Sequence, residues 1–426
     1  MPPSGLRVGV AFGGRSVEHD VSIVTGLQAL SVLEERHSPV PIYIARSGRW
    51  YTGEALRELS VYQRDPPSRG TPGRGGHPEG HKQAGGGDPD AEEIHLDLHR
   101  GRLLRAATGG SLLRPPWRGT GSRRSGGRGN QSIELDVVVL ATHGTQGEDG
   151  CLQGALELAR LPYVGPPVGA AAAAMDKVMT KAVLAQATLP SLGHLALRRE
   201  EWDMDKSACP TRARGAFDFP MYVKPASLGS SVGVSRCSSD AELLDALELC
   251  FELDRACIVE PSVEGGIEVN CAVIGRPGVE PRASVCEQPV AAESFLSFED
   301  KYMGGAKSSG MKGAQRLIPA PISDGLTAQV RDLAKRAFTA FGCAGVTRVD
   351  FLIDSSERVY INELNTIPGS FSFYLWEPAG VPFARLMDDL IDLALDEHRE
   401  KLRTTTVFAT NLLAERASGP KTGDKA

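Results

Sequence analysis

A lysine followed by a run of small residues forms the first candidate site. In the stretch YVKPASLGSSVGVSR, an apolar segment typical of a strand leads into Lys224, and serines and glycines follow it, among them Ser230 and Ser231. Backbone N–H groups in such a loop can point at an anion, and a lysine adds a point charge suited to phosphate. A flexible hairpin turn is the alternative, but the lysine favours phosphate binding. The chain lacks GxxxxGK[ST], so a P-loop nucleotide site is not supported.

The stretch TRVDFLIDSSERVYINELN forms the second candidate site, and it predicts a hairpin that turns at residues 355–358. Alternation along a strand puts Arg348 and Asp350 on one face, and Glu363 and Asn365 on one face. That turn places Asp350 opposite Glu363, a repulsive pairing unless something compensates it. Two carboxylates and an amide oxygen suit Mg²⁺ that also holds nucleotide phosphates. The alternative is a solvated face on which Arg348 is the ion-pair partner.

Two further regions carry polar groups in loops. Residues 298–320, FEDKYMGGAKSSGMKGAQRLIPA, are rich in glycine and lysine and predict either a mobile lid over an anionic site or a plain surface loop. Glu18 and His19 lie between a predicted strand and a helix start, and His143 ends the strand VVVLA. Ligands of open α/β sheets bind beyond the carboxyl ends of strands, so both positions suit a site. For His143 alone, a hydrogen-bonded turn residue is the simpler interpretation.

Apolar periodicity predicts the elements that position these residues. Alternating strands and helices predict a doubly wound N-terminal α/β domain over residues 1–167. An α+β unit over residues 168–265 follows and begins with one continuous helix over residues 171–187. Residues 266–400 form a strand-rich unit that ends in a helix, and residues 401–426 form a tail.

Residues 64–130 interrupt the first domain. Glycine, proline and arginine dominate this stretch, and only residues 94–108, IHLDLHRGRLLRAAT, have the pattern of strands. Such a composition buries too little apolar area to offset the entropy of ordering, so a largely disordered insertion is predicted. Arginine and glycine runs can bind RNA, although a tolerated surface loop is the preferred interpretation.

Length, charge and cysteine usage set limits on the class of protein. A chain of 426 residues predicts two or three domains. The N-terminus lacks the pattern of a signal peptide, and no segment approaches the roughly 20 apolar residues of a membrane helix. The eight cysteines are scattered without a CxxC pair, so neither a zinc site nor a disulfide framework is expected and a reducing cytoplasm is predicted. The net charge of −6 argues against a chain-wide nucleic-acid surface.

Seven motifs in order make the chain resemble the D-alanine–D-alanine ligases of the ATP-grasp superfamily. The resemblance runs from Leu6 to about His398, apart from the insertion. Its motifs are GGRSVEHDVS, HGTQGEDGCLQGALELARLPYVG, AMDKVMTKAVL, VKPASLGSSVGV, DKY, TRVDFLID and NELNTIPGS. It implies a three-domain α/β ATP-grasp fold, in which a doubly wound N-terminal domain precedes two subdomains that hold ATP between them. It also implies a role in peptidoglycan precursor synthesis, small-molecule substrates, no membrane or nucleic-acid partner, and a homodimer.

The resemblance also implies roles for individual residues. Contacts to ATP are implied for Lys177, Lys224, Ser231, Glu260 at the adenine, Glu268 at the ribose, and Lys301 at the transferred phosphate. Ligands for two Mg²⁺ ions, which Mn²⁺ is expected to replace, are implied for Asp350, Glu363 and Asn365. Catalytic groups are implied for Glu18 at the ammonium of the first D-alanine, for Ser230 and Tyr302 in a network with Glu18, and for Arg348 and the Gly369 N–H at the oxyanion. Substrate contacts are implied for His143, Tyr374 and Leu375.

The implied reaction is phosphorylation of one D-alanine by ATP, followed by attack of the second D-alanine on the acyl phosphate. The sequence departs from the family at three places. The segment from Glu260 to Glu268 is one residue longer than usual, and the predicted lid is longer and richer in glycine and lysine. Tyr374 stands where many relatives have the serine that binds the carboxylate of the second substrate. The acceptor therefore stays open between D-alanine, D-serine and D-lactate.

Two other functions compete with a ligase. The stretch GVAFGGRS follows a strand and Arg46 ends the next one, which would suit an NADP-dependent dehydrogenase. However, GxGxxG is absent and no acidic residue ends the second strand. An RNA-binding protein acting through the insertion is the non-enzymatic alternative.

Overall fold

The computed structural model describes residues 5–63, 91–106, 132–290 and 315–407. Residues 298–314 of the predicted lid, with Lys301 and Tyr302, most of the predicted insertion, and the end of the tail lie outside these described residues, whereas residues 315–320 of the predicted lid are described. Within them, no helix has both the length and the apolar character needed to cross a bilayer. All eight cysteines are described, and all are free thiols.

The N-terminal part is built on an eight-stranded sheet in the order β6-β5-β4-β3-β2-β1-β7-β8. Four strands are mutually parallel, as the apolar runs predict: β1 (Arg7–Gly13), β2 (Ser38–Ile44), β7 (Val137–Leu140) and β8 (Tyr163–Val164). The rest of the sheet is antiparallel: β3 (Trp50–Thr52), β4 (Glu92–Asp97), β5 (Arg102–Arg105) and β6 (Ser132–Glu134). The helical elements are α1 (His19–Leu33), η1 (Glu54–Arg57), α2 (Leu59–Gln63) and α3 (Cys151–Ala159).

The hairpin β4–β5 corrects the predicted insertion. It forms from the only part of residues 64–130 whose pattern predicts strands, and it lies in the sheet between β3 and β6. Ile94 and Leu103 are each 1% exposed and pack in a core with Ile42 and Leu140. This part of the interruption is therefore an ordered element of the first domain's sheet.

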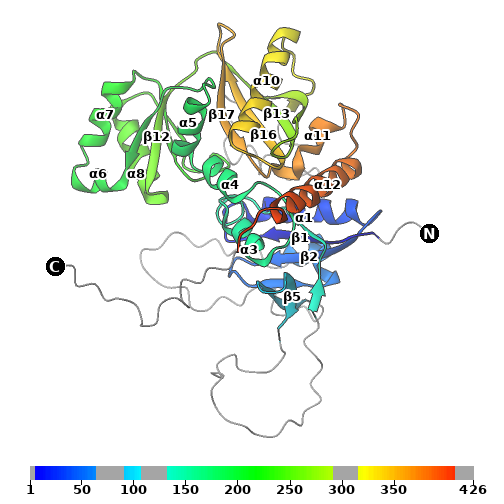
Figure 1. The fold of residues 1–426 in the computed structure, drawn as a ribbon. Coiled ribbons are helices and arrows are strands. Elements are labelled where there is room, and N and C mark those ends of the chain that lie inside the picture. The colour runs from blue at the N-terminus through cyan, green and yellow to red at the C-terminus, as the bar shows by residue number, and fades with distance from the viewer. Residues whose placement is uncertain (1–4, 64–90, 107–131, 291–314, 408–426) are drawn as a thin grey trace, which may run out of the picture.

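The middle of the chain forms a separate unit, drawn in green at the upper left of Figure 1. Its antiparallel sheet has the order β11-β10-β12-β9, with β9 (Leu195–Arg198), β10 (Met221–Pro225), β11 (Ser235–Cys237) and β12 (Ala256–Pro261). The helices of this unit are α6 (Arg199–Met204), α7 (Ala208–Ala216) and α8 (Asp240–Leu253). The helices α4 (Val168–Met175) and α5 (Lys177–Gln186) precede it in the chain, but their buried side chains pack in the core of the C-terminal sheet.

The predicted continuous helix over residues 171–187 is in fact two helices. Asp176 adopts an extended conformation between α4 and α5, and its carboxylate accepts hydrogen bonds from the N–H groups of Val178 and Met179 at 2.8 and 3.0 Å. An aspartate in this N-cap position satisfies N–H groups that a helix start leaves without partners. The cap fixes the direction of α5, which carries two lysines toward the candidate site.

The C-terminal part contains a five-stranded antiparallel sheet in the order β15-β14-β13-β16-β17. The strands are β13 (Ile267–Gly275), β14 (Arg282–Val290), β15 (Gln315–Leu317), β16 (Gly345–Ile353) and β17 (Val359–Asn365). The helical elements are α10 (Asp324–Ala340), η2 (Gly369–Ser372), α11 (Phe373–Trp376) and α12 (Phe383–Leu402). Val269, Cys271 and Val349 point to one face and pack in a core with α10, which leaves the polar residues of these strands on the opposite face.

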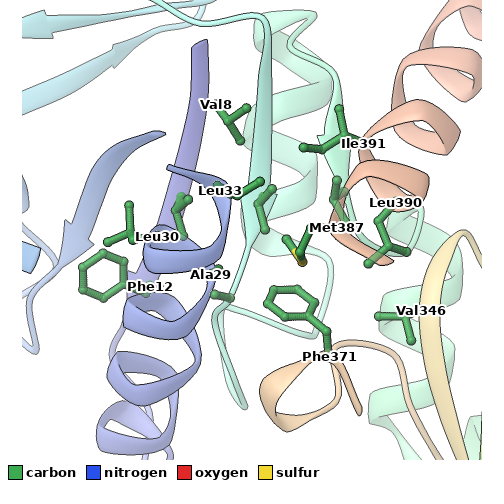
Figure 2. Close-up of a cluster of buried hydrophobic side chains, with 14 of the residues drawn as sticks. Val8, Phe12, Ala29, Leu30, Leu33, Val346, Phe371, Met387, Leu390 and Ile391 are labelled. Atoms are coloured by element: carbon green, nitrogen blue, oxygen red, sulfur yellow. The ribbon is translucent and has the colours of Figure 1, made fainter. Parts of the chain in front are cut away.

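One apolar core joins the N-terminal and C-terminal parts, and Figure 2 shows its centre. Leu30 and Leu33 of α1 and Met387 and Ile391 of α12 belong to this core, and Phe371 lies between the two helices. Helix α12 also packs against β7, β8 and β16, so it connects the two sheets (Figure 1). Loops of the first domain are thereby held against the polar face of the C-terminal sheet.

The β4–β5 hairpin can be tested by truncating its buried side chain. Ile94→Ala should lower the free energy of unfolding by roughly 2–5 kcal/mol, because it leaves a cavity in a closed core. Leu98→Ala, at a 47% exposed position in the turn of the same hairpin, should change it by no more than about 0.5 kcal/mol. Urea unfolding of both variants measures the difference, and equal effects would show that the hairpin adds no stability.

Candidate active site

The hairpin of β16 and β17 brings the two predicted carboxylates together. Asp350 pairs with Glu363, and Arg348 pairs with Asn365, as predicted. The turn differs from the prediction, because Ile353 already pairs with Val359 and the loop covers residues 354–358. A bulge opposite Asp350 and Phe351 restores the predicted register by taking up one extra residue. The extra residue, Asn362, accepts a hydrogen bond from Lys224 Nζ at 3.2 Å.

Arg348 and Asp350 form a buried ion pair. The Arg348 Nε and Nη2 groups donate to the two oxygens of Asp350 at 2.6 and 2.7 Å, and Asn365 Nδ2 donates to the same carboxylate at 2.9 Å. Burial alone would lower the pKa of Arg348, but the Asp350 carboxylate outweighs it and raises that pKa well above its ordinary value. The Asp350 side chain is only 2% exposed, so it does not lie on a solvated face, whereas the ion pair with Arg348 that the alternative named is present.

Asp350, Glu363 and Asn365 fit a magnesium ion by the chemistry of their donors. All three offer oxygen, the ligand atom that Mg²⁺ takes in proteins, and all three belong to two paired strands. In the described part of the chain, no three His, Cys, Asp or Glu side chains gather into a metal-binding group. The candidate metal site therefore consists of two carboxylates and one amide.

A second charged cluster lies between β10, β12 and α5. The Glu260 carboxylate is 1% exposed and pairs with Lys181 at 2.5 Å and with Lys224 at 2.6 Å. Burial acts to raise the pKa of Glu260, but the two ammonium groups outweigh it and lower that pKa to about 2. Sequence reasoning missed Lys181, although it lies four residues after Lys177 and thus on the same side of α5.

The Lys177 side chain contacts the backbone of the small-residue loop. Its Nζ donates to the Leu228 carbonyl at 2.6 Å, and burial lowers the pKa of this lysine. Ser230 and Ser231 in the loop have φ values of 52° and 58°, an uncommon conformation for residues other than glycine. The loop that follows Lys224 is therefore a turn of defined conformation.

The tip of this loop reaches the first domain at Glu18. The Ser230 hydroxyl donates a hydrogen bond to the Glu18 carboxylate. A Cβ at Gly229 would lie 3.0 Å from Glu18 Oε2, and one at Gly144 would lie 2.6 Å from it. Glycine at both positions allows the backbone to approach the carboxylate this closely.

His143 connects the first domain to the segment after β17. Its Nε2 lies 3.0 Å from Thr25 Oγ1, which accepts a hydrogen bond from the Ser370 N–H at 3.2 Å. Burial lowers the pKa of His143 to about 4, so the ring is neutral at physiological pH. The ring therefore acts as a hydrogen-bonding link between the two parts.

Glu148 is a buried carboxylic acid that sequence reasoning missed. It accepts hydrogen bonds from the N–H groups of Gly144 at 2.7 Å and Ile367 at 3.3 Å. Burial and the nearby Glu18 carboxylate raise the pKa of Glu148 well above its ordinary value. The signal for it was its place in the motif HGTQGEDG, five residues after His143.

A cavity of about 1000 Å³, including its open mouth, joins these groups. The predicted site residues that line it are Glu18, His143, Ser230, Glu268, Arg348, Glu363, Asn365, Gly369 and Tyr374. Lining residues that sequence reasoning did not single out include Glu148, Asn270, Glu287 and Arg316. Asp350 does not line the cavity but is paired with Arg348, which does. The cluster of Lys177, Lys224 and Glu260 lies beside the cavity. The Leu375 side chain is fully buried in the core and is not among the residues that line the cavity.

Comparisons with known proteins agree with this arrangement. The family models named D-ala D-ala ligase N-terminus and D-ala D-ala ligase C-terminus match residues 7–166 and 183–392. The chain belongs to the D-alanine–D-alanine ligase family. A D-alanine–D-alanine ligase of Thermosipho africanus is 30% identical over 96% of this chain and 98% of its own. The predicted ligase family is thereby confirmed, and the dehydrogenase alternative is not supported.

Solved structures of ligases have the same fold. The D-alanine–D-alanine ligase from Coxiella burnetii has a TM-score of 0.71 and 27% identity, over 94% of this chain and 97% of that one. The VanG D-Ala:D-Ser ligase from Enterococcus faecalis has a TM-score of 0.70 and 25% identity, over 92% of this chain and 100% of that one. The predicted three-domain ATP-grasp class is consistent with both neighbours.

In this member of the ligase family, Tyr374 belongs to a polar cluster at one side of the cavity. The buried Glu287 carboxylate accepts hydrogen bonds from Tyr374 Oη and Asn270 Nδ2, each at 3.1 Å. Arg316 Nη1 donates to the same carboxylate at 3.1 Å, and its guanidinium lies 4.4 Å from the centre of the Tyr374 ring. Burial raises the pKa of Tyr374, so the phenol stays a hydrogen-bond donor.

The Glu260 cluster predicts a specific pH dependence of stability. Because the pKa of Glu260 is lowered from 4.5 to about 2 in the folded protein, the charged carboxylate stabilises the fold above about pH 4.5, and that contribution is lost as the pH falls toward 2. Glu260→Gln should lower the free energy of unfolding at pH 6 by roughly 3–5 kcal/mol, because two buried lysines lose their partner. The deficit relative to the unsubstituted protein should shrink at pH 3.

Urea unfolding at both pH values measures this effect. Glu264→Gln is the matched control, because Glu264 carries the same charge just beyond β12 but pairs with Arg236 at the surface. It should unfold close to the unsubstituted protein at pH 6. A Glu260→Gln deficit of the same size at pH 6 and pH 3 would contradict the electrostatic interpretation.

Proposed function

We propose that this enzyme joins two D-alanine molecules, consuming ATP and giving D-alanyl-D-alanine, ADP and phosphate through an acyl-phosphate intermediate. The observation that carries the proposal is the convergence of Glu18, Arg348 and the Gly369 backbone in one cavity beside a lysine cluster. This reaction needs three kinds of group: a carboxylate that binds an ammonium group, lysines that bind phosphate, and a guanidinium with a backbone N–H, both facing a developing oxyanion.

The first D-alanine is proposed to bind at the Glu18 end of the cavity. Its ammonium group pairs with Glu18, which the Ser230 hydroxyl orients. Burial and the nearby Glu18 carboxylate raise the pKa of Glu148, so this carboxyl group competes less strongly than Glu18 for the ammonium group. The substrate carboxylate then extends toward Arg348, where it is activated.

The nucleotide is proposed to bind where the middle unit meets the C-terminal sheet. Lys177, Lys224 and the Ser231 loop contact the phosphates, Glu260 marks the adenine end, and Glu268 marks the ribose. The Glu260 carboxylate also keeps Lys224 charged, because it raises the pKa of that lysine against the effect of burial. Lys301 and Tyr302, proposed for the transferred phosphate and for the Glu18 network, lie outside the described residues.

Magnesium is the proposed cofactor, with Asp350, Glu363 and Asn365 as its ligands. Family membership implies the use of ATP and typically of Mg²⁺; two ions, and replacement by Mn²⁺, are the finer proposal. When bound, Mg²⁺ neutralises negative charge on the phosphate groups during transfer. The oxygen-rich donor set fits such an ion, while Arg348 supplies positive charge to Asp350 in the structure described here.

The second step is peptide-bond formation. The amine of the second D-alanine attacks the acyl carbon, the carbon–oxygen bond to phosphate breaks, and the amine loses a proton. Arg348 and the Gly369 N–H face the developing oxyanion. The two hydrogen bonds from Arg348 to Asp350 hold the guanidinium in place beforehand, which avoids reorganisation during the reaction.

A D-alanine–D-serine or D-alanine–D-lactate ligase is the second candidate. A named D-Ala:D-Ser ligase is among the similar structures, and Tyr374 replaces the serine that the family resemblance implies at the acceptor. The homodimer and the cytoplasmic location also remain proposals, the second supported by eight free thiols without a disulfide.

The reaction itself is tested by product analysis. ADP and phosphate should appear only when ATP, Mg²⁺ and D-alanine are all present, and mass spectrometry should detect D-alanyl-D-alanine. D-Serine and D-lactate, each added with D-alanine, test the second candidate. Formation of AMP and pyrophosphate would contradict the acyl-phosphate mechanism.

The role of Asp350 is tested by a neutral substitution. Asp350→Asn removes a proposed metal ligand and the partner of Arg348, so kcat should fall by roughly 100-fold or more, the size typical for loss of a transition-state contact. Asp332→Asn removes the same charge from the exposed face of α10 and should keep full activity. If both variants retain activity, the carboxylate hairpin has no part in catalysis.

A further inference from the structure

In the described part of the chain, carboxylates outnumber cations around the cavity. Among the described residues that line it, the acidic side chains are Glu18, Glu148, Glu268, Glu287 and Glu363, and the positively charged ones are Arg316 and Arg348. Arg348 already uses Nε and Nη2 on Asp350. Each amino-acid substrate carries a carboxylate of its own, and a carboxylate taken out of water needs a cation or several donors.

Arg316 lies on β15, the strand at the opposite edge of the C-terminal sheet from β17, and the segment after β17 is the part that reaches Glu148 beside Glu18. Arg316 Nη1 pairs with the Glu287 carboxylate, which is 1% exposed, while the Arg316 side chain is 28% exposed and faces the cavity. Stacking on the Tyr374 ring fixes the plane of the guanidinium. Both Arg316 and Arg348 lower the pKa of Tyr374 against the effect of burial, so the two guanidiniums flank the same hydroxyl.

The positions of the charged groups along the cavity indicate where the acceptor amino acid binds. The donor ammonium belongs at Glu18, and the acyl carbon belongs at Arg348 and Gly369. The acceptor amine must approach that carbon, so the acceptor carboxylate, only two bonds from the amine, has to lie on the far side of Arg348 from Glu18. The cation of the described cavity on that side is Arg316.

We propose that Arg316 binds the carboxylate of the second, acceptor amino acid. The inference rests on the proposed ligase activity and goes beyond it by naming the acceptor-binding residue. A guanidinium has five N–H donors in a planar fork that matches a carboxylate, and the pair with Glu287 engages only Nη1. The Tyr374 ring, on which Arg316 stacks, forms a wall that favours a small acceptor side chain.

A competition between two acceptors tests the proposal without depending on total activity. The enzyme is given ATP, Mg²⁺, D-alanine and D-alaninamide, which has the acceptor amine but no carboxylate and so cannot serve as the donor. Mass spectrometry gives the ratio of D-alanyl-D-alanine to D-alanyl-D-alaninamide. The unsubstituted enzyme should favour the acid by roughly 10- to 100-fold, the discrimination expected from hydrogen bonds to a charged group.

Substitution of Arg316 should remove this preference. In Arg316→Met the ratio should fall to within about threefold of unity, while the KM for the donor D-alanine changes by less than about threefold. Arg316→Lys keeps the charge without the fork and should give an intermediate ratio. Arg336→Met, which removes an exposed arginine of α10 outside this cavity, should keep the original ratio.

Each outcome decides the matter. An unsubstituted enzyme that uses acid and amide equally, or an Arg316→Met variant that keeps the preference for the acid, would overturn the proposal. If Arg316→Met does not fold, the unsubstituted enzyme and Arg316→Lys still give the decisive ratio. Failure of the unsubstituted enzyme to make any dipeptide would instead contradict the ligase function itself.

Discussion

The repulsion between Asp350 and Glu363, which face each other across β16 and β17, is the constraint on which the rest of the site depends. The face of the C-terminal sheet that carries these two carboxylates lies against other parts of the protein. Their negative charge therefore has to be balanced by protein groups or by a bound cation. Arg348 balances Asp350 with two hydrogen bonds and is thereby fixed at the centre of the cavity. The same carboxylates that suit a metal ion thus also position the guanidinium proposed for the oxyanion.

The N-terminal, middle and C-terminal parts of the chain meet at this site. The segment after β17 connects the C-terminal sheet to the first domain. Ser370, Phe371 and Ser372 all have positive φ values, a conformation that costs each non-glycine residue roughly 1–3 kcal/mol. Burial of Phe371 between α1 and α12 offsets part of that cost. The hydrogen bonds from Ser370 through Thr25 to His143 then hold the Gly369 N–H at a fixed distance from the first domain.

The sequence was informative wherever a short-range pattern determines the geometry. Alternation along β16 and β17 was enough to predict that Asp350 faces Glu363, even though the turn was placed wrongly and a bulge at Asn362 corrected the register. Contacts between residues far apart in the sequence were not predictable. Glu287 and Arg316 lie on the neighbouring strands β14 and β15, and no local sequence pattern shows that these two strands pair. Likewise, the cap at Asp176 competes with helix continuation, and helical periodicity alone does not show which one wins.

The site has a lysine-rich part and a carboxylate-rich part. This arrangement sets the order in which the substrates lie along the site. Lys177, Lys181 and Lys224 gather around Glu260 beside the Ser230 loop, where polyanionic ATP is proposed to bind. Among the described residues that line the cavity, carboxylates outnumber cations, which suits substrates that arrive with an ammonium group. Apolar side chains in these positions would stabilise the fold at least as well, since desolvating an ion pair costs about what the pairing returns. Fold stability alone therefore does not account for the buried charges, whereas a reaction that transfers a phosphoryl group onto one zwitterion and couples it to another accounts for both clusters and for their order along the site.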